Sequence, residues 1–63
     1  MDAEEILEKA LKMEKANVNF YRSMLEKASE DIKDLIEILI DEEIEHVRKI
    51  EERLKVLKIL KKK

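Results

Sequence analysis

Two glutamates and a histidine, Glu14, Glu43 and His46, are the residues of this sequence best suited to chemistry. Carboxylate oxygens and imidazole nitrogens are ligands for divalent transition metals. Glu43 and His46 stand three residues apart, so on a helix both point to the same side. A Glu-x-x-His pair alone is a weak signal, because a single histidine on a helix is more often a core residue than a ligand. The pair gains meaning only if Glu14 reaches the same level of the fold.

The composition predicts the elements that position these residues. Charged residues make up 48% of the chain and hydrophobic residues 44%, and there is no Gly or Pro. Gly and Pro adopt the backbone conformations of tight turns at low energetic cost. A chain without them does not suit the repeated tight turns of a β-sandwich or a β-barrel, so these folds are excluded. Residues 28–31 are the one break, where Ser29 or Asp31 can cap a helix. We predict an all-α fold: one domain over residues 1–63, with helices at about 2–28 and 31–61 in an antiparallel hairpin.

Charge and hydropathy exclude several classes of partner. The net charge of −2 does not favour a nucleic-acid partner. No apolar run is long enough for a membrane span or a signal-peptide core, so we expect no membrane partner. The absence of cysteine excludes a disulfide scaffold, a zinc finger and a thiol nucleophile. It also suits a reducing cytosol, and we expect a cytoplasmic protein.

Stepping alternately by four and three residues traces an inward-facing line along each predicted helix. The first line runs through Ala3, Leu7, Ala10, Glu14, Asn17, Tyr21, Met24 and Ala28. The second runs through Ile32, Ile36, Leu39, Glu43, His46, Ile50, Arg53, Leu57 and Leu60. Each line is apolar at both ends and polar in the middle. Glu14 lies about 15 residues before the turn, and the Glu43–His46 pair lies on average about 15 residues after it, so an antiparallel hairpin brings all three to one level.

Further apolar residues flank these lines. They are Ile6, Met13, Phe20, Leu11, Val18 and Leu25 on the first helix, and Leu35, Ile40, Val47 and Leu54 on the second. Such wide apolar stripes need more partners than one hairpin offers, and a lone hairpin of this size is marginally stable. We predict a homodimer, or a higher even oligomer, that forms a four-helix bundle. The polar level is near the middle of both helices, so a twofold axis perpendicular to the bundle or along it would unite two copies of the site.

The dimer would gather four carboxylates and two neutral imidazoles at one level. Buried carboxylates without counter-charge are costly. Two divalent cations would balance the four negative charges, so we predict two metal ions per dimer. Fe, Mn and Zn suit these ligands alike. Glu14, Glu43 and His46 are the predicted metal ligands.

The segments Glu14-Lys15-Ala16-Asn17-Val18-Asn19-Phe20-Tyr21 and Leu39-Ile40-Asp41-Glu42-Glu43-Ile44-Glu45-His46 resemble one half of a rubrerythrin-type, ferritin-like bundle. The resemblance implies that Glu14 is a terminal ligand, Glu43 a bridging ligand and His46 a ligand to one iron. It implies that Tyr21 donates a hydrogen bond beside the centre. It also implies two iron ions per dimer, in an oxidoreductase or ferroxidase acting on O₂, peroxide or Fe²⁺. Dimerisation would replace the fusion of two hairpins found in that family, whose two turns lie at opposite ends.

Two features depart from the family pattern. No cysteine is present for a rubredoxin-like iron centre, so electrons would come from an unknown donor. Asn17 stands where small residues are usual. Considered alone, Asn17 would be a polar core residue that fixes how the helices align along their axes. Tyr21 alone would be an ordinary core residue. The alternative function is a structural or interaction module without catalysis, and the sequence leaves open whether the protein is an enzyme.

Overall fold

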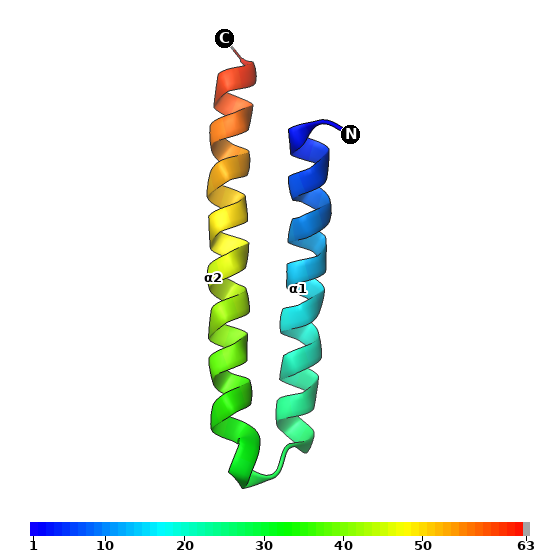
Figure 1. Cartoon of the computed structure of the whole chain (residues 1–63), viewed down its shortest axis with the longest axis vertical. Helices are drawn as coiled ribbons and strands as arrows, with labels where there is room; N and C mark the ends of the chain where they lie inside the picture. Colours follow the sequence, from blue (N-terminus) through cyan, green and yellow to red (C-terminus); the bar gives the residue numbers. More distant parts are fainter. Residues whose placement is uncertain (63) are drawn as a thin grey trace.

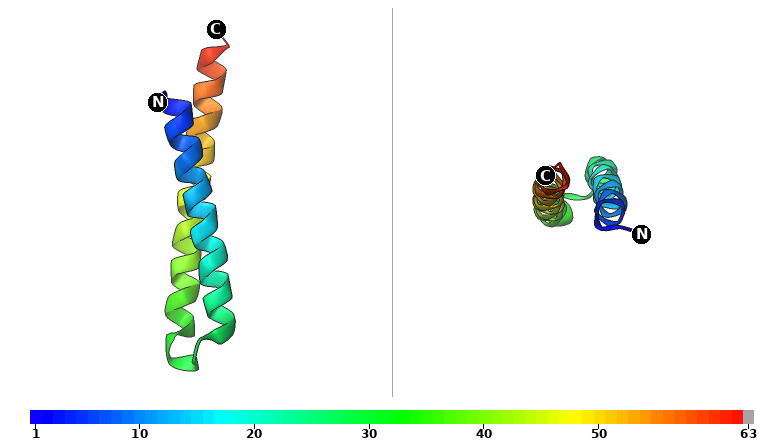
Figure 2. Two further views of the ribbon diagram at one scale, coloured as in Figure 1. Left: turned by 90° about the vertical axis from the view of Figure 1, so that its right-hand side faces the viewer. Right: turned by 90° about the horizontal axis from the view of Figure 1, so that it is seen from above.

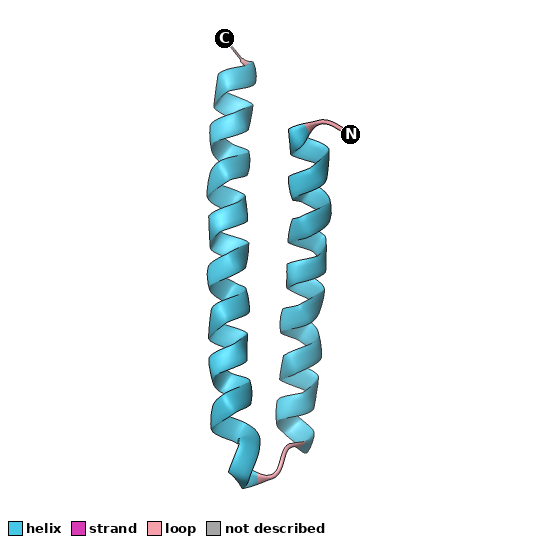
Figure 3. Ribbon diagram, viewed as in Figure 1, coloured by secondary structure: helices cyan, strands magenta, loops and turns pink. Residues whose placement is uncertain are grey.

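The computed structural model describes residues 1–62 and consists of two antiparallel helices, α1 (Ala3–Lys27) and α2 (Glu30–Lys61) (Figures 1 and 3). The predicted all-α hairpin is confirmed, and the helix ends fall within one residue of their predicted positions. Lys63, which the predicted domain includes, lies outside the described residues. Within residues 1–62, neither helix is long and apolar enough to cross a membrane.

Local interactions explain where each helix begins. The carboxylate of Asp2 caps α1 by accepting a hydrogen bond from the backbone N–H of Glu5 at 2.8 Å. Ala28 and Ser29 are extended, and this short connection reverses the chain. Ser29 occupies the N-cap position of α2, but its hydroxyl donates to the Asp31 side chain rather than capping the backbone. The tight connection holds the helices side by side along their length (Figure 2).

The contact between the helices matches the predicted line of α2 only in part, because Ile36 on that line is buried but so are Ile40 and Leu54 beside it. The buried apolar side chains are Val18, Ile36, Ile40 and Leu54. Ile40 and Leu54 were predicted to flank the inward line, whereas Leu60, on that line, is 57% exposed. The placement of Val18, Ile40 and Leu54 outside the hairpin core was therefore wrong. Each helix can turn only one stripe toward a single partner, so α2 is rotated about its axis from the predicted orientation.

The two broad sides of the hairpin differ in character. One side, the outer face, carries inter-helix ion pairs between Lys15 and Glu51 at 3.6 Å and between Lys58 and Glu8 at 4.0 Å. The heptad repeat places most of the exposed apolar residues on the opposite side. We call this side the open face: Ile6, Met13 and Phe20 of α1, and Ile32, Leu35, Val56 and Leu60 of α2, all between 44% and 66% exposed.

The hairpin leaves more surface in solvent than a compact protein of its mass does. Its accessible surface is 5193 Å². A compact monomer of 7.5 kDa is expected to expose about 4,200 Å². The excess agrees with a core that exists only along the line between α1 and α2, with the open face uncovered in the single chain.

Candidate metal centre

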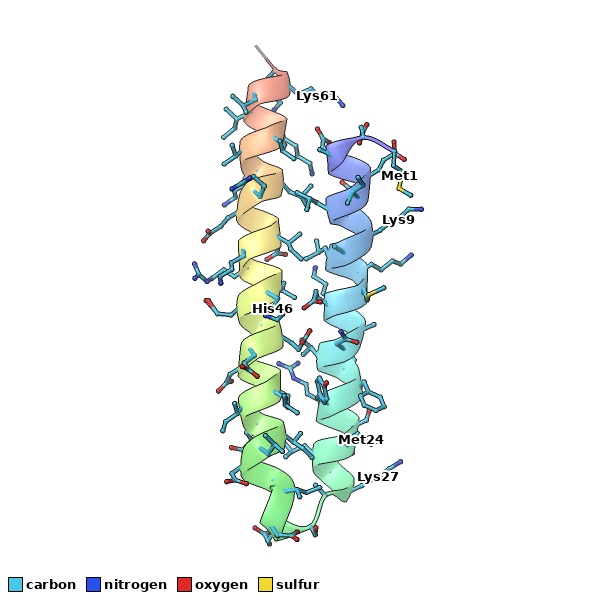
Figure 4. All side chains as sticks on the ribbon, in the orientation of Figure 1. Met1, Lys9, Met24, Lys27, His46 and Lys61 are labelled. Carbon is cyan, nitrogen blue, oxygen red and sulfur yellow. The ribbon has the colours of Figure 1, made fainter. Side chains whose placement is uncertain are left out.

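Glu14 of α1 and Glu43 and His46 of α2 form one cluster, in which each residue offers a donor atom within 4.8 Å of the others. Nδ1 of His46 lies 2.9 Å from Oε2 of Glu14 and 3.7 Å from Oε1 of Glu43. His46 is close to mid-height on α2 (Figure 4). The predicted convergence of these three side chains at one level is therefore found in the fold.

The helices place the cluster between the core and the open face. Glu14 and Glu43 are partly enclosed, with side chains 22% and 16% exposed, whereas the His46 side chain is 52% exposed. The rotation of α2 explains this difference, because it turns Glu43 toward α1 and leaves His46 at the edge of the open face. The two carboxylates are thus held by the hairpin, while the imidazole remains accessible to a partner or an ion.

The pKa values of the two carboxyl groups are shifted in opposite directions. The hydrogen bond with Glu43, followed by that with His46, lowers the pKa of Glu14 below its usual value. The hydrogen bond with Glu14, followed by partial burial, raises the pKa of Glu43. Of the two groups, Glu43 therefore has the greater tendency to be protonated. Two carboxylates this close repel once both are ionised, and a cation beside them would relieve that repulsion.

Asn17 has a role in the cluster that sequence reasoning missed. Its side-chain N–H donates toward Oε2 of Glu43 at 3.4 Å. The sequence interpretation treated this polar residue as a device for helix register. The available signal was its spacing, because Asn17 lies three residues from Glu14 on the same side of α1. Asn17 thus orients the carboxylate of Glu43 from the turn side of the cluster.

Tyr21 lies on the same line of α1, two turns from Glu14. It is half-buried and packs edge-on against Phe20, with ring centroids 5.6 Å apart. Among residues 1–62, no hydrogen bond joins its hydroxyl to Glu14, Glu43 or His46. The role of Tyr21 as a hydrogen-bond donor beside the metal centre therefore stays a prediction.

The donor set suits a divalent transition metal but is incomplete in one chain. Two carboxylates and one imidazole are ligands for Fe, Mn or Zn. These metals take four to six ligands in proteins, and the cluster offers three residues. Glu45, one residue from His46, instead forms an ion pair with Arg48 at 2.7 Å. Further ligands therefore have to come from solvent, a substrate or another chain.

An all-helical hairpin with a Glu/Glu/His cluster at mid-height defines a ferritin-like helical domain. The chain belongs to the rubrerythrin family, whose model matches residues 5–62. It is also 40% identical over 62 residues to an uncharacterized protein of Archaeoglobus fulgidus, and the match covers 98% of each chain. No solved structure gives a significant match to this chain. The resemblance read from the two segments of the sequence is thus confirmed at the level of the family.

Proposed function

We propose that the protein is a di-metal carboxylate protein, with two iron ions held between two copies of the hairpin. The observation that carries this proposal is the meeting of Glu14, Glu43 and His46 from two helices, with donor atoms within 4.8 Å of one another. Membership of the rubrerythrin family supports the same assignment.

Electrostatics favours a cation at this position. The pKa of Glu43 is raised because Glu14 lies beside it. A divalent ion held by Glu14 and Glu43 would relieve the repulsion between the two ionised carboxylates. His46, whose Nδ1 lies 2.9 Å from Oε2 of Glu14, would supply an imidazole nitrogen as a further ligand. A second copy would double the set to four carboxylates and two imidazoles, enough to balance two divalent ions.

When bound, a pair of iron ions supplies reversible one-electron changes at two neighbouring centres, which suits reactions of O₂, peroxide or Fe²⁺. Glu14, Glu43 and His46 of each copy would hold the two ions. Asn17 would keep the Glu43 carboxylate oriented, and Tyr21 would offer its hydroxyl to the same region. The reductant would be a separate protein or small molecule, because the chain has no cysteine for a second iron centre.

The test is metal content measured beside mass in solution. Purified metal-free protein would be titrated anaerobically with Fe²⁺ and analysed for bound iron and for molecular mass. We expect one iron per chain and a mass of two chains or a higher even number. Protein that binds no iron, and carries no stoichiometric metal when purified, would exclude the proposal.

A structural or interaction module is the second candidate function. Two observations favour it: the open face is apolar, and Glu14 already provides a partner for His46 without metal. Alanine substitutions at Glu14, Glu43 and His46 separate the two candidates. A scaffold would keep its assembly or become more stable, because partly buried charge is removed. A metal protein would lose its metal.

A further inference from the structure

We propose that Met13 is an oxidation site, at which hydrogen peroxide converts the thioether to a sulfoxide, and that this sulfoxide keeps a second copy off the open face. The inference rests on the proposed dimer. It adds a covalent modification to a chain that has no cysteine, and it makes assembly sensitive to oxidant.

The three methionines of the chain have different surroundings. Met13 is 66% exposed and Met1 is 77% exposed, whereas Met24 is half-buried. Met1 precedes α1 at the end of the hairpin opposite the turn, and Met24 lies close to the turn (Figure 4). Peroxide has to touch the sulfur to react, so exposure decides which thioethers are oxidised first. Of the two methionines within α1, Met13 is therefore the one open to peroxide.

Met13 lies at the centre of the apolar stripe that α1 contributes to the open face. Ile6 and Phe20 stand seven residues before and after it, one heptad in each direction, and are 53% and 57% exposed. The next residue in the chain is Glu14 of the metal cluster. A second copy that covers the open face and completes the metal centre would therefore also cover Met13.

The oxidation consumes one hydrogen peroxide per methionine. A lone pair of the sulfur attacks one peroxide oxygen, so that an S–O bond forms and the O–O bond breaks. The hydroxide that leaves takes the proton of the new S–OH group and becomes water. The sulfur loses two electrons and the peroxide gains them. Peroxide is among the substrates of the proposed centre, so the chain would meet this oxidant beside Met13.

The sulfoxide would place a polar group at the middle of the open face. Oxidation turns the flexible apolar side chain of methionine into a polar one and disrupts interfaces that bury it. Burying the sulfoxide oxygen without a hydrogen-bond donor is unfavourable. We therefore expect chains oxidised at Met13 to assemble poorly. Chains that have already assembled should be protected, because the second copy would shield the sulfur.

The test exposes the full metal-free chain to hydrogen peroxide, removes the peroxide with catalase and then adds Zn²⁺, which has no redox chemistry. Mass spectrometry of peptides locates each added oxygen, and sedimentation equilibrium gives the dimer dissociation constant. We expect oxygen on Met13 and Met1, little on Met24, and a dissociation constant raised about tenfold or more. Reduction by methionine sulfoxide reductases should restore the untreated value.

The matched variant is Met13→Leu, because leucine keeps the volume and apolar character of the side chain without the sulfur. Its dimer should resist peroxide, whereas Met1→Leu and Met24→Leu should be as sensitive as the parent protein. Peroxide added after Zn²⁺ has assembled the dimer should oxidise Met1 as before and leave Met13 largely intact.

Three results would overturn the inference and leave the proposed metal-binding dimer in place. They are a Met13 that peroxide leaves unmodified, an oxidised Met13 with no change in the dissociation constant, and an equal loss of affinity in Met13→Leu and the parent protein. An untreated parent protein that stays monomeric with Zn²⁺ would instead overturn the proposed dimer, and the control of assembly with it.

Discussion

Glu14 and His46 are 32 positions apart in the chain, and Oε2 of Glu14 lies 2.9 Å from Nδ1 of His46. This contact ties the centre of α1 to the centre of α2 at the edge of the open face. It also means that the metal-free hairpin holds the imidazole where the proposed centre needs it. Binding a metal through Nδ1 would replace the Glu14–His46 contact rather than require a new side-chain position.

The ligand role of His46 is tested with its neighbour Glu45 as control. His46→Ala removes a donor from the cluster, and we expect metal per chain to fall about tenfold or more. Glu45→Ala breaks the ion pair with Arg48 outside the cluster and should leave metal content nearly unchanged. Elemental analysis of both variants beside the parent protein decides the matter. Equal losses in the two variants would show that the ligand set is wrong.

Tyr21→Phe tests whether Tyr21 affects the reactivity of the metal centre without affecting its metal content. The substitution removes only the hydroxyl and keeps the ring that packs against Phe20. We expect unchanged metal content and an altered rate of iron oxidation by O₂ or peroxide, because a nearby hydrogen-bond donor tunes a centre more than it retains it. Stopped-flow absorbance gives the rate and elemental analysis the occupancy. A rate equal to that of the parent protein would remove Tyr21 from the chemistry.

The stability of the metal-free protein should respond to pH through the shifted pKa values of Glu14 and Glu43. The lowered pKa of Glu14 gives stability that is present above the unfolded value near 4.5 and lost as pH falls through the folded value. The raised pKa of Glu43 gives stability that is present below 4.5 and lost as pH rises through its folded value. The pair therefore stabilises the fold most near pH 4.5.

Thermal melts against pH test this expectation, with Glu43→Gln as control. In the absence of metal, the difference in melting temperature between the parent protein and Glu43→Gln should be largest at and below pH 4.5 and should shrink as pH rises through the folded pKa of Glu43. Added metal should reverse the trend, because ligands must be deprotonated to bind it. Acid should then release metal and lower the melting temperature together. A metal-independent profile at every pH would contradict coupling between the site and folding.

The role of the open face as the dimer interface is tested by placing a lysine on that face and, as a control, on the outer face of α2. Leu35 is 54% exposed on the open face, and Ile44 is 44% exposed on the outer face. Leu35→Lys should raise the dimer dissociation constant about tenfold or more, because burying a leucine stabilises an interface by about 1.5–3 kcal/mol. Ile44→Lys should change it little. Sedimentation equilibrium measures both, and equal effects would mean that the open face is not the interface.

The sequence alone determined the hairpin and the level at which Glu14, Glu43 and His46 meet. A helix rises by a constant 1.5 Å per residue, and a short connection leaves almost no freedom in how two helices align along their axes. Counting residues from the turn at Ser29 therefore fixes height. The family also follows from residues close together in the chain, namely Glu14 to Tyr21 and Glu43 to His46.

Only the tertiary structure decided how far each helix is rotated about its own axis. Leu39 and Ile40 both fit a heptad line, and so do Arg53 and Leu54, so periodicity cannot choose between them. Packing against α1 chose Ile40 and Leu54, because these side chains fill the space between the helices. That rotation turned Glu43 inward toward Asn17 and left His46 at the edge of the open face, where a metal or a second copy can reach it.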